Sequence, residues 1–163
     1  MEILAEGYWP YFLLALAIVV GFLLLRQLSA ARRLPYEKRE CLLTKSELQF
    51  YGVLLRVMDD DMALFAMVRI ADLVRVQKGT KKYRSWLNRI LSKHVDFVVC
   101  DRETLTPLMA IELDDRSHER PERQARDKLV NQVFESSGLP LVRFKVEKEY
   151  SLDAVRQRIL KAL

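Results

Sequence analysis

The spacing of apolar residues divides this chain into stretches of helical and of extended periodicity. Residues 44–58 place apolar side chains three and four positions apart, a spacing that predicts a helix with one buried face. Short apolar runs rich in Val, Ile and Phe, bounded by turn residues, instead predict strands. The pattern predicts helices over residues 44–58, 81–93, 122–137 and 152–163, and strands over residues 62–70, 95–100, 108–113 and 139–144. This order of elements is typical of a small three-layer α/β domain with a mixed central sheet.

The predicted helices carry boundary signals and apolar faces. The sequence from Thr44 to Glu47 has the form of a capping box, and Gly138 is placed to end the helix over residues 122–137. We expect the inward faces to be formed by Leu48, Tyr51, Leu54, Leu55 and Met58 in the first helix, by Leu129, Val130, Val133 and Phe134 in the third, and by Leu152, Val155, Ile159 and Leu160 in the last. The cap gives Glu47 a structural role, and its position beside the apolar face also leaves an active-site role open.

An uninterrupted apolar run occupies residues 8–25. As a helix rising about 1.5 Å per residue, this run is just long enough to cross a bilayer core of about 30 Å, which predicts a transmembrane helix. Aromatic residues gather at its start and Arg26 follows its end. The positive-inside rule then predicts an inner-membrane protein with its N-terminus outside and its C-terminal domain in the cytoplasm. A cleaved signal peptide is the alternative, but it needs a basic segment before the apolar run, and here the order is reversed.

The positive charge of the chain lies beyond the apolar run. The sequence carries 27 Lys and Arg against 22 Asp and Glu, and residues 1–25 hold two of the acids and no Lys or Arg. This surplus favours a polyanionic partner, either nucleic acid or an anionic membrane surface. Residues 26–43 lack a clear period and predict a basic juxtamembrane linker that can contact anionic lipid. We therefore expect an N-terminal segment over residues 1–25, a linker over residues 26–43 and an α/β domain over residues 44–163.

Two carboxylates interrupt an otherwise apolar predicted strand. Side chains two positions apart on a strand share a face, so Glu112 and Asp114 are expected about 7 Å apart, with His118 just beyond the strand end. Asp96 opens the neighbouring apolar run and brings a third acid to the adjoining strand. Three carboxylates so placed repel one another unless they are protonated or bind a cation. The pattern predicts a divalent-metal site formed by Asp96, Glu112 and Asp114.

These residues match a family pattern that also includes Arg126-Asp127 and the run from Gly138 to Phe144. Over about residues 35–150 the chain resembles the bacterial "domain of unknown function" family numbered 2726. That family is similar to the restriction-endonuclease-like fold of the PD-(D/E)xK superfamily, near the very-short-patch repair endonucleases. The resemblance implies a nuclease that uses magnesium or manganese to hydrolyse phosphodiester bonds.

The superfamily surrounds its metal ion with an acid on the first core helix, an Asp on the second strand and an acid-x-Lys pair on the third. The matching positions here are Glu47, Asp96, Glu112 and, in place of the lysine, Asp114. A lysine can orient or help deprotonate the attacking water, whereas Asp114 can bind metal, accept a hydrogen bond or act as a carboxylate base. Repair-type relatives that lack this lysine look as if they rely on a nearby histidine, and this resemblance makes His118 a candidate. The alternative for His118 is a surface or capping role.

Two groups of cations are candidates for phosphate contacts. Arg123, Arg126 and Lys128 lie on the predicted helix after the acidic strand, where they can neutralise a phosphate or form salt bridges on a solvated face. The helix over residues 81–93 combines basic residues with an apolar face, so its outer face is either solvated or in contact with phosphates.

Two function hypotheses from different classes follow. The first is a membrane-anchored, divalent-metal-dependent nuclease-like protein that acts on nucleic acid at the cytoplasmic side. Its candidate catalytic residues are Asp96, Glu112, Asp114, His118 and Glu47. The second is a catalytically inactive nuclease-fold module that binds nucleic acid or a partner protein at the membrane, which the missing lysine favours. A lipid-surface or envelope scaffold is a third interpretation, based on the anchor and the basic linker alone.

Overall fold

The computed structural model describes residues 8–31, 34–115 and 121–163, with backbone only for residues 30, 31 and 121–123. The chain separates into two compact units, residues 1–40 and residues 41–163.

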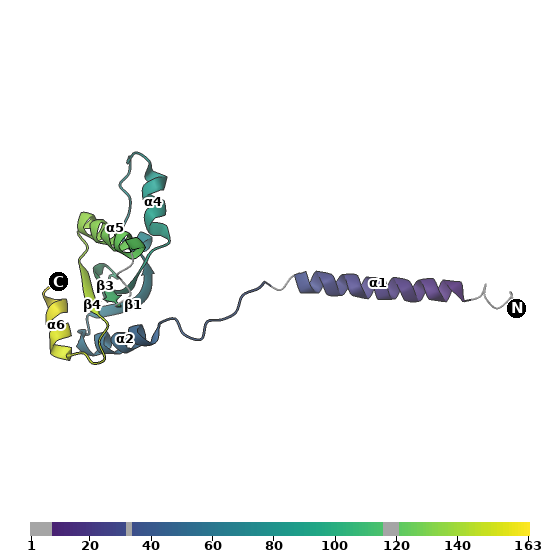
Figure 1. Ribbon diagram of the computed structural model, residues 1–163, viewed down its shortest axis with the longest axis horizontal. Coiled ribbons are helices and arrows are strands. Elements are labelled where there is room, and N and C mark those ends of the chain that lie inside the picture. Colours follow the sequence, from purple (N-terminus) through teal and green to yellow (C-terminus); the bar gives the residue numbers. More distant parts are fainter. Residues whose placement is uncertain (1–7, 32–33, 116–120) are drawn as a thin grey trace. The chain divides into compact units, whose positions relative to one another are not determined.

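The first unit contains helix α1, Trp9–Ala31 (Figure 1). Its 23 residues correspond to about 34 Å of helix at the standard rise per residue. By length and composition, the stretch Trp9–Ser29 is apolar enough to cross a membrane. The apolar run predicted from the sequence is therefore one helix, and it extends beyond residue 25.

The second unit is built on a four-stranded sheet in the order β1-β2-β3-β4. Its strands are β1 (Met62–Arg69), β2 (His94–Asp101), β3 (Pro107–Asp114) and β4 (Leu141–Lys145). The first three strands pair antiparallel, and β4 joins β3 in parallel. The sheet is therefore mixed, as the order of elements in the sequence predicts. Residues 97–100 of β2 are all buried, which explains why this strand is a continuous apolar run rather than an alternation.

Helices cover both faces of the sheet. They are α2 (Lys45–Val57), α3 (Ile70–Leu73), α4 (Tyr83–Leu91), α5 (Pro121–Ser137) and α6 (Leu152–Leu160). Figure 1 shows α2 and α6 on one side of the sheet and α4 and α5 on the other. On the first side, Phe50 and Val155 pack in one cluster with Phe97 of β2. On the second side, Ile90 and Phe134 belong to a separate cluster. The unit therefore has three layers.

The start of α2 follows the sequence prediction, and its inward face follows it in part: Leu54 is buried and Tyr51 and Met58 pack against the core, whereas Leu48 and Leu55 do not. The Glu47 N–H donates to Thr44 Oγ1 and the Thr44 N–H donates to Glu47 Oε2, so the capping box is confirmed. The buried residues of α2 are Phe50, Val53, Leu54 and Val57. Leu48 and Leu55, predicted to face inward, are 52 % and 55 % exposed. That prediction was wrong because α2 carries two adjoining apolar stripes, and contact with the ring of Phe97 selects the stripe that contains Phe50.

The last helix shows a smaller departure of the same kind. Val155 and Ile159 are buried as predicted, while Leu152 and Leu160 are exposed. A helix of nine residues meets the sheet through one i,i+4 pair, so the flanking leucines remain outside. Gly138 follows α5 with φ of 71°, a left-handed conformation that suits glycine and ends the helix where the sequence predicts.

Strand β1 lies at one edge of the sheet and contains a local departure from extended geometry. Met67 has φ of 56°, while the residues on either side keep their pairing with β2. A left-handed conformation at a residue other than glycine costs about 1–3 kcal/mol, so the surrounding pairing must hold it in place. Strand β1 therefore stays paired with β2 on both sides of a kink at Met67.

Candidate functional site

The candidate site begins where β2 and β3 separate. Backbone pairing between these strands runs as far as Phe97 and Ile111, whereas the pairing of β2 with β1 continues to His94. At this split a carboxylate takes the place of a backbone acceptor, because the Leu113 N–H donates to Asp96 Oδ2 over 2.7 Å. The side chain of Asp96 is therefore fixed by the backbone of the acidic strand itself.

Glu112 is buried, and it lies close enough to Asp96 for the two charges to interact. Only 7 % of its surface is exposed, and no other charged residue in the described ranges is buried to this degree. Burial is the main cause that raises the pKa of Glu112 to about 8, followed by the negative charge of Asp96. The cations Arg143 and Arg126 act in the opposite direction, and Asp114 adds a smaller increase. Glu112 is therefore mostly protonated at neutral pH.

The pKa of Asp96 is also raised. Burial is the largest cause, and the hydrogen bond from Leu113 opposes it. The negative charge of Glu47 raises the same pKa and the positive charge of Arg126 lowers it. Because the charge of Asp96 makes ionisation of Glu112 harder, the two carboxyls titrate as a pair. A proton or a bound cation must compensate them at neutral pH.

Asp114 is held by a cation from the neighbouring strand. Arg143 lies on β4 in register with Glu112, and its Nη1 donates to Asp114 Oδ1 over 2.6 Å. The Nε of the same guanidinium donates to Asn131 Oδ1 over 3.2 Å, and its Nη2 lies 3.6 Å from Asp127 Oδ1. Arg143 thereby links β3, β4 and α5. The residue predicted as a metal ligand or base is thus engaged in a half-buried ion pair.

The cations predicted on α5 differ in their surroundings. Arg126 Nη2 donates to the backbone carbonyl of His94 over 3.5 Å. Its positive charge lowers the pKa of both Asp96 and Glu112, so it lies close to the carboxylate pair. Lys128 is exposed on the same helix. The structure therefore brings Arg126 to the candidate site.

Glu47 fills the structural role that the sequence predicts and lies near the candidate site. Its Oε2 accepts the Thr44 N–H over 2.7 Å, which is the structural role. Its negative charge also raises the pKa of Asp96, so it lies within electrostatic reach of the carboxylate pair. The cap is confirmed, and an active-site role for Glu47 stays a prediction.

The side-chain donors of this region bear on the predicted metal site. Within the described part of the chain, no group of three or more His, Cys, Asp or Glu side chains is arranged to hold a metal ion. His118 and the side chain of Arg123 lie outside the described residues. Asp96 and Glu112 nevertheless fit a magnesium ion, which prefers oxygen donors and commonly takes one or two carboxylates together with water and substrate phosphates. A divalent cation also offsets the cost of ionising Glu112 in a buried position.

Sequence reasoning missed Arg143 and Asn131 as members of this region. A signal for Arg143 exists, because it is a charged residue within the apolar run 139–144, and a buried strand tolerates such a residue only with a partner. Asn131 gives no comparable signal, since polar residues are ordinary on a half-exposed helix. Its role depends on the packing of α5 against β4.

Comparison with known proteins places the second unit in a family. The chain matches the family described as "Protein of unknown function (DUF2726)" over residues 39–163. No curated protein and no solved structure matches the chain significantly. The matched region contains the entire sheet and all the carboxylates and cations described above. The chain therefore belongs to the DUF2726 family of proteins of unknown function.

Proposed function

We propose that this protein is a membrane-anchored, divalent-metal-dependent nuclease-like hydrolase with a restriction-endonuclease-like domain. The observation that carries the proposal is the pair formed by Asp96 and Glu112, in which Glu112 has a pKa of about 8. Burial and mutual repulsion both oppose the ionisation of two carboxylates in such a place, so folding alone gives no reason for them. A bound cation makes the arrangement favourable, and magnesium with coordinated phosphate suits these donors.

The resemblance to the PD-(D/E)xK superfamily supports the same assignment. Asp96 lies on the second strand and Glu112 on the third, which are the superfamily positions of two metal-binding acids. Both strands belong to a mixed sheet that is covered by helices on its two faces. This arrangement is the coarse feature that a restriction-endonuclease-like fold requires.

Each residue of the site has its own role in the proposed chemistry. Asp96 and Glu112 hold the ion, which when bound supplies Lewis acidity and lowers the pKa of a coordinated water. Arg126 binds the charged oxygens of the phosphate. Arg143 orients the carboxylate of Asp114, which serves as a hydrogen-bond acceptor or carboxylate base. His118 supplies a further proton-transfer group.

The proposed location is the cytoplasmic side of the inner membrane. Tyr8, Trp9 and Tyr11 gather at the start of α1, where aromatic side chains suit a membrane interface. Arg26 and the basic residues of the linker follow the apolar run, where they favour the cytoplasmic side and contact with anionic lipid. The domain then meets nucleic acid within the cytoplasm.

A second candidate function is a catalytically inactive nuclease-fold module that binds nucleic acid or a partner protein at the membrane. The ion pair between Asp114 and Arg143 favours it, because this pair occupies the position where the superfamily has its lysine. A carboxylate that is hydrogen-bonded to an arginine inside the protein is less available to contact an attacking water.

Titration calorimetry of the full chain in nonionic detergent micelles tests the metal site with Mg²⁺ and Mn²⁺. Below about pH 8 an incoming ion must displace the proton of Glu112, so we expect release of about one proton per bound ion. Two buffers of different ionisation enthalpy measure that proton. Glu112→Gln and Asp96→Asn are expected to abolish binding, whereas Glu103→Gln, at an exposed position in the turn after β2, leaves it unchanged.

The same chains are then titrated with a cleavage-resistant phosphorothioate oligonucleotide present, because magnesium completes its shell with substrate phosphates. Cleavage of labelled DNA and RNA is measured in parallel. Metal binding with cleavage supports the nuclease. Nucleic-acid binding without metal binding or cleavage supports the inactive module. Binding of neither metal nor nucleic acid refutes the nuclease and the nucleic-acid-binding form of the module.

A further inference from the structure

The net positive charge of the chain is concentrated in one segment. Residues 73–93 contain seven Lys and Arg and no Asp or Glu, whereas the whole chain has a net charge of +5. The remainder of the chain is therefore slightly acidic, at −2. The cations of this segment are Arg75, Lys78, Lys81, Lys82, Arg84, Arg89 and Lys93, and all but the last are exposed. Such a segment binds polyanions.

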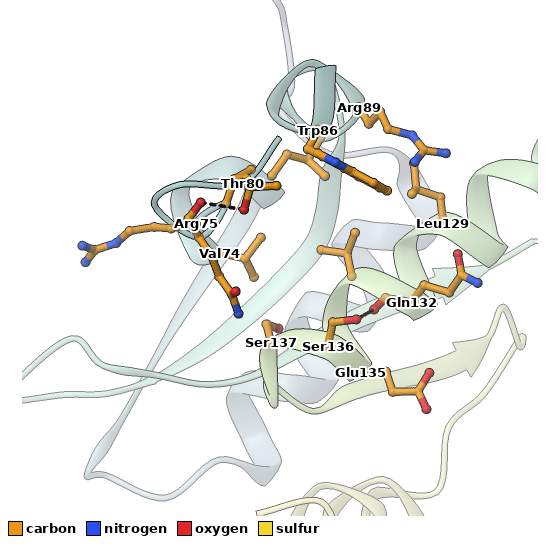
Figure 2. A pocket seen from close by; sticks show the side chains of 14 residues that line it. Val74, Arg75, Thr80, Trp86, Arg89, Leu129, Gln132, Glu135, Ser136 and Ser137 are labelled. Atoms are coloured by element: carbon orange, nitrogen blue, oxygen red, sulfur yellow. Dashed lines mark hydrogen bonds between the residues drawn. The ribbon is translucent and has the colours of Figure 1, made fainter. Parts of the chain in front are cut away.

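A cavity of about 630 Å³ lies between this basic segment and α5. Its volume falls in the usual range for small-molecule sites, about 300–1,000 Å³. Figure 2 shows Trp86 and Arg89 on the α4 wall of the cavity, across from Gln132 and Ser136 of α5. The cavity therefore has a basic, aromatic wall and a polar wall.

Trp86 is the central feature of the first wall. Almost half of its surface, 46 %, is exposed, although it lies beside the buried Ile90. The guanidinium of Arg89 lies 4.9 Å from the centre of its ring, which fixes the ring by a cation–π contact. An exposed aromatic ring held by an arginine is a stacking platform for a nucleobase, and such stacking tolerates any base.

The second wall suits the polar edges of a base rather than a phosphate. Gln132 offers an amide, Ser136 offers a hydroxyl oxygen as an acceptor because its proton is donated to the Gln132 backbone carbonyl, and Glu135 offers a carboxylate that accepts hydrogen bonds from exocyclic amino groups. The charge of Glu135 repels phosphates, which leaves the phosphates to the basic segment. In Figure 2 the guanidinium of Arg75 points away from the cavity. The phosphate backbone of a nucleic acid can reach it there.

We propose that this cavity binds a base of a single-stranded nucleic acid, with Trp86 as the stacking platform and residues 75–84 as the phosphate contacts. A base paired inside a duplex cannot turn its face onto a ring that lines a cavity, so the site selects unpaired strands. An anionic lipid surface suits this cavity less well, because its α5 wall is polar and carries Glu135.

The position of the cavity connects it to the carboxylate pair. Leu129, Gln132 and Ser136 of α5 line the cavity, and Arg126 on the same helix lies beside Asp96 and Glu112. A nucleic-acid strand that runs along α5 can therefore reach both the cavity and the carboxylate pair. The inference rests on the proposed function for nucleic acid as the ligand, and it adds the strand form and the surface that holds it.

The test is fluorescence anisotropy with a fluorescein-labelled oligothymidylate, its RNA counterpart and a hairpin duplex, using the full chain in nonionic micelles. EDTA is present, so that binding is measured without metal-dependent cleavage. We expect single strands to bind more tightly than the duplex. Trp86→Ala is expected to weaken single-strand binding about tenfold, and Trp86→Phe to retain most of it. In a Trp9→Phe background, bound oligothymidylate quenches the fluorescence of Trp86, the remaining tryptophan.

Matched charge variants test the phosphate contacts. The variant Lys78→Gln, Lys81→Gln, Arg84→Gln is expected to reduce the salt dependence of binding by about two in the log–log slope, at about 0.7 per lost contact. The control variant Lys45→Gln, Lys148→Gln, Lys161→Gln loses the same charge from exposed positions outside the segment and keeps the slope.

Three results overturn the inference: unchanged affinity in Trp86→Ala, an equal effect of the two charge variants, or Trp86-dependent binding to phosphatidylserine vesicles without binding to oligonucleotides. Failure of the proposed nuclease function and failure of the proposed base-binding cavity give different results. Trp86-dependent binding without metal-dependent cleavage refutes the nuclease alone, and cleavage that is indifferent to Trp86 refutes this cavity alone.

Discussion

Protonation of Glu112 makes a quantitative prediction for stability. Its pKa is about 8 in the folded chain against 4.5 for a free glutamate. Between these values the folded state holds a proton that the unfolded state has lost, so the free energy of unfolding falls as pH rises. Each pH unit costs about 1.4 kcal/mol, so the full shift amounts to roughly 5 kcal/mol, of which roughly 4 kcal/mol is lost by pH 8. The raised pKa of Asp96 acts in the same direction.

The perturbation is Glu112→Gln, which keeps the shape of the protonated side chain and cannot ionise. We expect the variant to lose the part of the pH dependence that Glu112 causes and to keep the contribution of Asp96, so that its stability exceeds that of the wild type by roughly 4 kcal/mol near pH 8. Urea unfolding of the full chain in micelles, followed by the fluorescence of Trp86 in a Trp9→Phe background, measures this difference. Glu103→Gln is the control and keeps the wild-type profile. Wild-type stability that rises from about pH 5 to about pH 8, or a wild-type slope in Glu112→Gln, refutes the reasoning.

The same unfolding assay checks three further predictions. Arg143→Met removes the cation that pairs with the half-buried Asp114 and is expected to cost about 2 kcal/mol of stability. The control Arg156→Met breaks an exposed ion pair and is expected to cost less than about 1 kcal/mol. Equal losses contradict a stabilising role for the pair of Arg143 and Asp114. Thr44→Ala removes the acceptor of the capping box and is expected to cost about 1 kcal/mol, with faster amide exchange confined to the first turn of α2. Gly138→Ala places a Cβ at φ of 71° and is expected to cost about 1 kcal/mol, although nothing lies near enough to clash, so an unchanged midpoint opposes this explanation.

Local signals in the sequence predict the order of elements and the acidic strand. Glu112 and Asp114 stand out because two charges at a spacing of two interrupt an apolar run, and Asp96 stands out at the start of the preceding run. Gly138 and the capping box at Thr44 are local signals too, and both lie where predicted.

Features that depend on packing over long distances could not be predicted in the same way. The buried face of α2 is chosen by the rings it meets on the sheet, so Leu48 was misassigned although its spacing is helical. The role of Arg143 depends on the parallel register of β4 with β3, which no local pattern encodes. Helix α3 has four residues and is too short to show a period. The cavity beside Trp86 exists only because α4 packs near α5.

The kink at Met67 bears on how copies of this chain coexist. The outer edge of β1 offers backbone N–H and C=O groups on which a second chain can add a strand, a common start of aggregation. Because Met67 leaves extended geometry in the middle of this edge, an incoming strand cannot pair along its full length. Under the proposed anchoring through α1, chains would diffuse in the two dimensions of a membrane and meet often. The kink lets them collide without joining into a continuous intermolecular sheet.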